Sequence, residues 1–195
     1  MSWENEKILR NGNFRARKLH SKNYKQEQNI ILKWLENKIY NKEKILEIGC
    51  GEFPLFELST KIDIAEVRPD IIKIDCNLPF ASKLDKQFNI IIVQYVICHL
   101  WNIEDFFIEC YKLLHNNGIL IISLPNDNYW RKRLNFRKKT DEQLWFLDNK
   151  TYWRLNPKTL KILAEKYKFV IDDIRPIGKS RLLCISPSMI AKLRK

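Results

Sequence analysis

The sequence lacks the features that mark membrane and secreted proteins. None of its apolar runs approaches the roughly 20 residues that a membrane-spanning helix needs. The N-terminal segment, MSWENEKILRNGNFRARK, is polar throughout and has no apolar region of the kind found in secretory signals. We therefore expect a cytoplasmic protein without a membrane span.

The sequence lacks any pair of cysteines at metal-ligand spacing. The cysteines form no CxxC pair, and they are scattered at residues 50, 76, 98, 110 and 184. This scatter argues against a disulfide framework or a metal site and favours reduced, buried thiols.

The apolar residues that are present are sufficient for a packed core. They make up 45% of the 195 residues, and 12% of the chain is aromatic, which is typical of a folded domain and not of a disordered chain. No internal repeat or low-complexity linker divides the sequence. We expect one domain over residues 1–195.

The net charge of +12 raises the question of an anionic partner, such as RNA or a phosphorylated metabolite. Basic residues cluster at Arg15, Arg17, Lys18 and Lys22, and again over residues 131–139. Lysine, asparagine and isoleucine are nevertheless abundant along the whole chain, as an AT-rich genome would produce without selection for binding. Both explanations stay open.

Short apolar runs alternate with segments of helical periodicity. Helices are predicted at 24–40, 55–59, 103–115 and 157–168, and strands at 44–49, 61–66, 70–75, 88–95, 119–125, 169–176 and 181–187. The last two strands are expected to pair antiparallel. This alternation predicts an α/β fold with a mostly parallel sheet that is covered on both faces.

The central motif is Leu46-Glu47-Ile48-Gly49-Cys50-Gly51, between a predicted strand and a predicted helix. Glycine is suited to this place because the backbone must turn tightly and let a ligand approach without a Cβ in the way. Pro54 stands where the GxGxxG motif of nicotinamide-dependent dehydrogenases requires a glycine, which argues against that class.

Four segments, in order, are similar to motifs of class I S-adenosylmethionine-dependent methyltransferases. Residues 45–51 (ILEIGCG) resemble the glycine motif after the first strand, and residues 74–80 (IDCNLPF) resemble the element after the third. Residues 88–100 (FNIIIVQYVICHL) and 116–126 (NNGILIISLPN) resemble the fourth and fifth strand segments. On these motifs the chain is identified as a member of that family.

The resemblance implies a Rossmann-like fold, with a mostly parallel seven-stranded sheet and an antiparallel C-terminal hairpin. It also implies S-adenosylmethionine as the cofactor. Within the single domain we expect a helical cap over 1–43, the cofactor-binding core over 44–126, and a substrate-side lid with the C-terminal strands over 127–195.

The resemblance assigns cofactor roles to residues of the first two strands. Gly49, Cys50 and Gly51 would pass close to the methionine and ribose portions of the cofactor, with Glu47 near its amino end. The acid at the end of the second strand would accept hydrogen bonds from the ribose hydroxyls. Glu66 fits that place best, and Asp63 is the alternative because the preceding segment is unusually short.

Residues of later segments are expected to contact the adenine and the methyl group of the cofactor. Asp75 would accept from the adenine amino group, with the backbone N–H of Cys76 beside it. Gln94 and Tyr95 would lie beside the transferring methyl group. Tyr95 and His99 are the candidate catalytic residues, although in the family the histidine position usually supports the following loop.

The segment after the fifth strand is dense in aromatic and cationic residues and is the expected substrate site. It loosely resembles MetW-like and related small-molecule methyltransferases. The substrate-side candidates are Asn126, Tyr129, Trp130, Arg133, Trp153 and Arg154. The N-terminal segment around His20 and Tyr24 is expected to close over the same site.

The expected function is methyl transfer to an oxygen or nitrogen atom of a small, anionic metabolite or sugar intermediate. An RNA methyltransferase is the alternative that the charge favours. A third reading is an inactive, cofactor-binding partner subunit. It is favoured by Phe53, where a small residue is usual, and by Asn89, where an aspartate commonly opens the fourth strand. The oligomeric state is not predicted.

Overall fold

The computed structural model describes residues 14–35, 44–51, 54–66, 68–128, 153, 155–178 and 182–195, with side chains of the first segment described from Tyr24 onward. The described strands are β1 (Ile45–Ile48), β2 (Thr60–Asp63), β3 (Ile71–Lys73), β4 (Phe88–Gln94), β5 (Leu114–Pro125), β6 (Val170–Ile177) and β7 (Ser188–Arg194). The described helices are α2 (Phe14–Leu35), α3 (Ile103–Leu113) and α5 (Pro157–Lys166), with short 3-10 helices η2 (Ala81–Lys83), η3 (Ile97–His99) and η6 (Leu183–Ile185).

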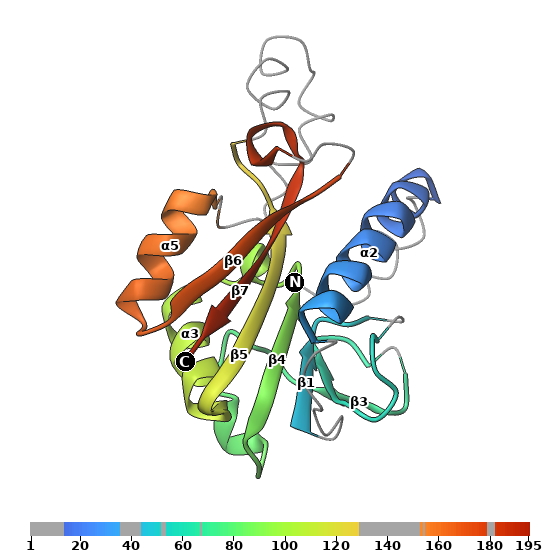
Figure 1. The fold of residues 1–195 in the computed structure, drawn as a ribbon. Helices are drawn as coiled ribbons and strands as arrows, with labels where there is room; N and C mark the ends of the chain where they lie inside the picture. The colour runs from blue at the N-terminus through green and yellow to red at the C-terminus, as the bar shows by residue number, and fades with distance from the viewer. Residues whose placement is uncertain are drawn as a thin grey trace.

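All seven strands form one sheet in the order β3-β2-β1-β4-β5-β7-β6 (Figure 1). The strands from β1 to β5 pair parallel, and β7 is antiparallel to both β5 and β6. The predicted mostly parallel, seven-stranded Rossmann-like fold with antiparallel C-terminal strands is therefore confirmed. Because β1 lies between β2 and β4, the chain reverses its direction of winding at the carboxyl ends of β1 and β4, where open α/β sheets bind ligands.

Two apolar layers cover the two faces of the sheet. Alternate residues of each strand point to opposite faces, so a buried parallel strand is apolar on both. The larger layer packs α3 and α5 against one face and includes five fully buried phenylalanines: Phe80, Phe88, Phe106, Phe107 and Phe169. The smaller layer packs Ile30, Ile31 and Leu35 of α2 against the other face. Figure 1 shows α2 on the opposite side of the sheet from α3 and α5.

Side-chain caps define where α3 and α5 begin. Asn102 accepts a hydrogen bond from the backbone N–H of Asp105 at 3.2 Å. Asn156 accepts from two backbone N–H groups and forms a reciprocal capping box with Thr159, with Pro157 in the first turn. Such caps stabilise a helix by about 1 kcal/mol. The predicted helices at 103–115 and 157–168 are confirmed, each ending a little earlier than expected.

The predicted helix at 55–59 is wrong, because this segment forms turns instead. The backbone N–H groups of Leu55 and Phe56 donate to the buried carboxylate of Glu47 and so wrap around that side chain. A helix would direct these N–H groups along its axis. The strands expected at 61–66 and 70–75 are also shorter, since β2 ends at Asp63 and β3 spans only Ile71–Lys73.

The last predicted strand, 181–187, is wrong as well. The described part of that segment is a loop with η6, and the strand is β7, one segment later. Asn126 explains the loop, because its side-chain amide donates to the carbonyl oxygens of Leu183 at 2.6 Å and Ser186 at 3.0 Å. Those carbonyls are therefore not available to a sheet. Pro187, which lacks an N–H, then precedes β7.

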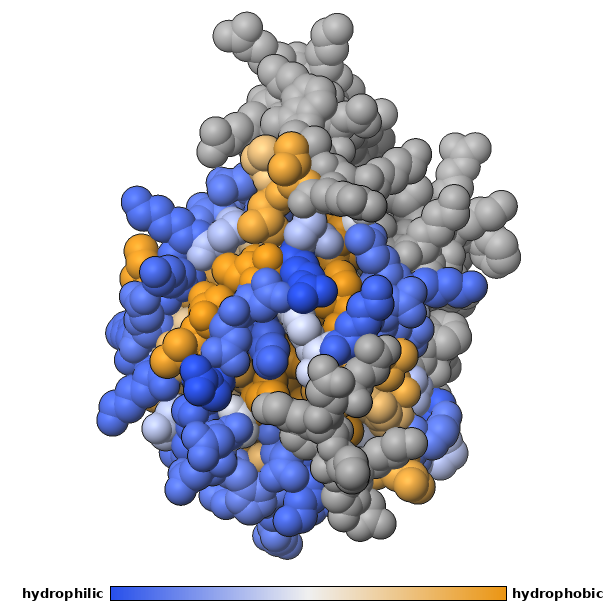
Figure 2. Space-filling view, in the orientation of Figure 1, coloured by the Kyte–Doolittle hydropathy of each residue, from blue (hydrophilic) through white to orange (hydrophobic). Residues whose placement is uncertain are grey.

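The N-terminal helix also differs from its predicted bounds of 24–40. α2 begins at Phe14, and its described part ends at Leu35. Its early residues include good helix formers but lack the apolar periodicity that marks the later turns. No helix in the described part of the chain has the length and apolar character that crossing a membrane would require. In the view of Figure 2, hydrophilic residues cover most of the described surface, and hydrophobic residues gather between them near the middle.

Candidate functional site

The loop after β1 combines one tightly packed glycine with one open glycine. Gly49 has φ +73 and donates its N–H to the carbonyl oxygen of Ile62 at 2.9 Å. A Cβ on Gly49 would lie 2.1 Å from Cγ2 of Val96, so no side chain fits there. Gly51 has φ +55, and among the described residues, its chain neighbours aside, no atom lies within 4 Å of a Cβ placed on it. The loop therefore leaves open space beside Gly51, into which a ligand can approach the backbone.

Glu47 holds this loop from beneath. Its side chain is fully buried, and its carboxylate accepts hydrogen bonds from the N–H of Leu55 at 2.6 Å, the N–H of Phe56 at 2.9 Å and the hydroxyl of Ser59 at 2.6 Å. Burial raises the pKa of Glu47, and these donors oppose the shift. The carboxylate is thus directed into the protein's own loop.

Of the two acids considered for the second strand, Asp63 lies beside the glycine loop. It is the last residue of β2, is 8% exposed, and accepts a hydrogen bond from the backbone N–H of Gly51 at 3.0 Å. Its other oxygen accepts from the N–H of Ala65 at 3.1 Å. Glu66, which was expected at the strand end, lies beyond it and is exposed. The strand continues one residue past its last pair with β1, because Asp63 still pairs with Lys73 of β3, and the residues of β2 alone do not reveal this.

Asp75 and Cys76 follow β3 at the same edge of the sheet. Asp75 accepts from the backbone N–H of Asn77 at 2.9 Å and from its side-chain amide at 3.0 Å. The side-chain oxygen of Asn77 in turn accepts from the N–H of Trp101 at 2.9 Å. These bonds fix the loop after β3 against the segment after η3. Cys76 is buried, which raises the pKa of its thiol to about 12.

The carboxyl end of β4 carries one orphaned polar atom and one strained residue. Gln94 is buried, and its side-chain nitrogen has no acceptor among the described residues. Tyr95 has φ +55, which is unusual for a bulky side chain and typical of functional sites. Burial raises the pKa of the Tyr95 hydroxyl well above its ordinary value. His99 lies farther along, exposed at the end of η3.

Glu27 of α2, which belongs to none of the sequence motifs, also lies at this edge of the sheet. Glu27 is 1% exposed, and its carboxylate accepts a hydrogen bond from the hydroxyl of Ser123 on β5. Burial raises the pKa of Glu27 to about 7. One signal was present in the sequence: Glu27 occupies the apolar stripe of the helix that continues with Ile30, Ile31 and Trp34, where a carboxylate is out of place.

The described substrate-side candidates are Asn126 and Trp153. Asn126 is fully buried, and its side chain holds the loop that contains η6, as described above. Trp153 is 37% exposed, and its backbone N–H donates to the carbonyl oxygen of Cys98 at 3.4 Å. The other candidates lie outside the described residues: Tyr129, Trp130, Arg133 and Arg154.

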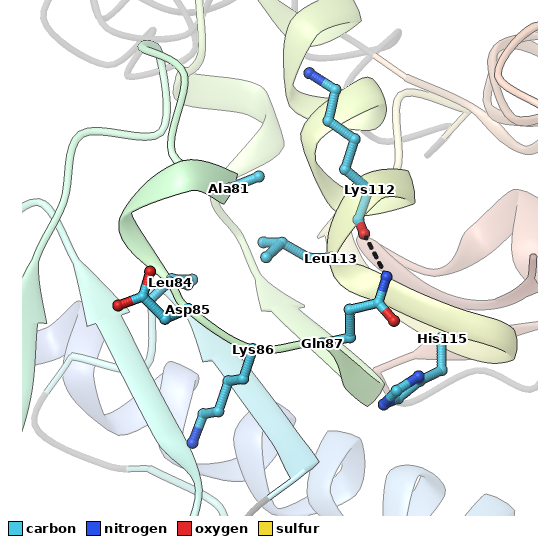
Figure 3. Close-up of a pocket in the computed structure, with 8 residues that line it drawn as sticks. All are labelled: Ala81, Leu84, Asp85, Lys86, Gln87, Lys112, Leu113 and His115. Atoms are coloured by element: carbon cyan, nitrogen blue, oxygen red, sulfur yellow. Dashed lines mark hydrogen bonds between the residues drawn. The ribbon is translucent and has the colours of Figure 1, made fainter.

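A separate hollow of about 510 Å³ lies at the amino edge of the sheet, between the segment that leads into β4 and the end of α3 (Figure 3). Gln87, on its wall, donates to the carbonyl oxygen of Lys112 at 3.4 Å. The glycine loop and Asp63 lie at the opposite, carboxyl edge, so this hollow is not part of the candidate site. Within the described ranges, no group of three or more histidine, cysteine, aspartate or glutamate residues is arranged to hold a metal ion.

The carboxyl-edge residues fit a ligand with both polar and cationic parts. Gly51 leaves room for it, Asp63 and Asp75 present carboxylates, and Gln94 presents a buried amide nitrogen without an acceptor in the described structure. S-adenosylmethionine, with its ribose hydroxyls, adenine and methionine end, has this chemistry.

Comparison with known proteins agrees with this fit. A family model for the methyltransferase domain matches residues 16–174. A probable S-adenosylmethionine-dependent methyltransferase of Mycolicibacterium smegmatis is 28% identical over 145 residues, which cover 66% of this chain and 52% of that protein. The chain thus spans about half the length of this relative.

Solved structures show the same fold at low sequence identity. A SAM-dependent methyltransferase from Thermotoga maritima superimposes with a TM-score of 0.70 at 15% identity, covering 100% of both chains. Magnesium protoporphyrin IX methyltransferase from Synechocystis PCC 6803, with bound S-adenosylhomocysteine (SAH), has a TM-score of 0.63 at 12% identity and covers 94% of this chain and 88% of that one.

Proposed function

Because the chain belongs to the S-adenosylmethionine-dependent methyltransferase family, we propose that its domain transfers a methyl group from S-adenosylmethionine to an oxygen or nitrogen atom of a small metabolite or sugar intermediate. The observation that carries this proposal is the contact between Asp63 and the N–H of Gly51 beside open space. It brings the acid of β2 and the glycine loop of β1 together at the carboxyl edge of the sheet, next to the point between β1 and β4 where the direction of winding reverses.

Asp63 is the residue we propose for the ribose hydroxyls. Each carboxylate oxygen accepts more than one hydrogen bond, so the bonds from Gly51 and Ala65 leave capacity for two hydroxyl donors. No described hydrogen bond connects Glu66 to the glycine loop. Asp63 therefore replaces Glu66 as the preferred ribose ligand.

The other proposed cofactor contacts follow the edge of the sheet. Asp75 and the backbone N–H of Cys76 would hold the adenine, since the loop that carries them is braced through Asn77. Gln94 and Tyr95 would lie beside the methyl group. Glu47 acts by fixing the glycine loop, because its carboxylate is already bonded to that loop.

When bound, S-adenosylmethionine supplies a methyl group activated by its sulfonium. The contribution of the protein is then alignment of the acceptor for in-line displacement and exclusion of water. A proton acceptor is needed only where the nucleophile is a hydroxyl or a protonated amine.

RNA is the alternative acceptor, favoured by the net charge of +12. The basic stretch at 131–139 lies outside the described residues. A steep fall of RNA binding with rising salt concentration would support this alternative. An inactive, cofactor-binding partner subunit is the third candidate, and the cytoplasmic location stays a prediction.

Calorimetric titration of the purified protein with S-adenosylmethionine, SAH and NAD in separate runs tests the proposal. We expect micromolar binding of the two adenosyl compounds and none of NAD. Binding without turnover of any metabolite or RNA acceptor would favour the inactive partner. Absence of binding to either adenosyl compound would overturn the proposed cofactor site.

A further inference from the structure

Glu27 lies near the carboxyl ends of β4 and β5, which are the strands nearest the proposed methyl position. In the register of the sheet, Gln94 of β4 pairs with Ser123 of β5. The preceding alternate residues of both strands pack in the same apolar layer as α2, so Gln94 and Ser123 share the face that α2 covers. Glu27 reaches this face from α2 and contacts Ser123.

Two buried polar atoms at this point lack partners in the described part of the chain. One oxygen of Glu27 accepts from Ser123, whereas the other, Oε2, is buried without a donor among the residues that the structure describes. The side-chain nitrogen of Gln94 is buried without an acceptor in the same part of the structure. Buried polar groups are nearly always hydrogen-bonded, because leaving one unpaired is unfavourable. Two such atoms lie on one face, at the ligand-binding edge of the sheet. They indicate that a bound ligand supplies the missing hydrogen-bond partners.

Among the residues that the structure describes, no positively charged group compensates Glu27. Among the described titratable groups, its charge acts on two tyrosines, Tyr24 on the same helix and Tyr95 after β4. Burial raises the pKa of both, and a negative Glu27 raises it further. Neither tyrosine can neutralise a carboxylate. Among the described ion pairs, none involves Glu27. A buried carboxylate that has no ion-pair partner in the described part of the chain is complementary to a cationic ligand.

We propose that Glu27 faces the methyl acceptor, that the acceptor is an amine, and that Glu27 removes the ammonium proton before transfer. This inference rests on the proposed methyl transfer from S-adenosylmethionine. It names the chemical class of the acceptor and adds a catalytic residue that the motifs of the sequence did not include.

An N–H bond of the bound ammonium breaks and an O–H bond forms at Oε2 of Glu27, which leaves a lone pair on the neutral nitrogen. That lone pair forms the N–C bond to the methyl group while the C–S bond breaks, and the electron pair of the C–S bond stays on sulfur. The products are an N-methylammonium and the thioether SAH, and the proton on Glu27 then passes to solvent.

Sinefungin tests this geometry without knowledge of the natural acceptor. In this analogue a carbon that bears an amine replaces the methylated sulfur, so an ammonium stands at the methyl position. We expect the wild-type protein at pH 8 to bind sinefungin at least tenfold more tightly than SAH in calorimetric titration. Glu27→Gln should bind SAH as the wild type does and lose the preference for sinefungin.

Glu165→Gln is the matched control, since Glu165 is exposed on α5, on the other face of the sheet. This variant should keep the full preference. The wild type supplies a second measurement, because its preference should shrink between pH 8 and pH 5.5 as Glu27 takes up a proton.

An unchanged sinefungin preference in Glu27→Gln would overturn the role of Glu27 while leaving the cofactor site intact. If Glu27→Gln does not bind SAH, the test is the comparison of the wild type at pH 8 and pH 5.5. An equal preference for sinefungin over SAH at both pH values would overturn the inference. Failure of the wild type to bind SAH would instead overturn the proposed function on which this inference rests.

Discussion

Asp63 and Gly51 are joined by a hydrogen bond of 3.0 Å from the backbone N–H of the glycine to the carboxylate. The bond connects the carboxyl ends of two neighbouring parallel strands, β1 and β2. Because the acid is anchored by this bond and by the N–H of Ala65, it is held in one orientation before any ligand arrives. The cofactor site we propose is preorganised in this sense.

Asp63→Ala should weaken the binding of SAH by roughly 1–3 kcal/mol, the value expected when a ligand's polar groups lose their partner. Calorimetric titration of the variant measures this loss. Glu66→Ala is the matched control and should bind SAH within about twofold of the wild type, because Glu66 is exposed beyond the end of β2. The reverse result would restore Glu66 as the ribose ligand: weakened SAH binding in Glu66→Ala and unchanged SAH binding in Asp63→Ala.

The two glycines of the loop should respond to substitution in opposite ways. Gly51→Ala places a methyl group in the open space beside the loop, so it should weaken SAH binding and lower the free energy of unfolding by only about 1 kcal/mol through its positive φ. Gly49→Ala drives a methyl group into Val96, so it should lower the melting temperature markedly. Thermal unfolding without ligand, followed by titration with SAH, separates the two effects. Equal losses of melting temperature would contradict the distinction.

Much of the fold was predictable because the central strands are apolar on both faces. β1, β4 and the later part of β5 are short buried runs, and a run of this kind between turns indicates a parallel strand. β7 was missed for the converse reason. Its residues include Lys192 and Arg194, whereas the preceding RLLCISP segment is more apolar, and only the bonds from Asn126 show why that segment is a loop.

The site was predictable where a motif is local and less so where tertiary packing decides. The Gly49–Gly51 loop follows from its place after a strand. The choice between Asp63 and Glu66 depends on where β2 stops pairing with β3, which is a property of two strands. Glu27 becomes a site residue only because α2 places it against Ser123, distant in sequence.

Asn126→Ala should act mainly by lowering the free energy of unfolding, and not by weakening the binding of a substrate. The side chain of Asn126 donates to two carbonyl oxygens of the η6 loop and accepts from the N–H of Asn128 at 3.1 Å, so its removal leaves buried groups unpaired. We expect a loss of about 2–3 kcal/mol in the free energy of unfolding, measured by urea denaturation. Asn156→Ala, which removes only an exposed helix cap, should lose about 1 kcal/mol. If Asn126→Ala has wild-type stability, its assignment as a substrate residue becomes the better explanation of its burial.

The carboxyl group of Glu27 should make the stability of the protein fall as the pH rises through the weakly acidic range. Burial raises its pKa from 4.5 to about 7, so between these values the folded state keeps a proton that the unfolded state has released. Stability therefore decreases with pH across this window, and the loss is complete above about pH 7. The difference in pKa corresponds to about 3 kcal/mol, since one pKa unit is worth about 1.4 kcal/mol.

Glu27→Gln carries no ionisable group at this position, so its stability relative to the wild type should increase by about that amount between pH 4.5 and pH 8. Urea denaturation at a series of pH values measures the difference, in which the titration of all other groups cancels. A difference that does not change with pH would show that Glu27 is ionised in the folded protein throughout, as it would be if it were paired with a cation.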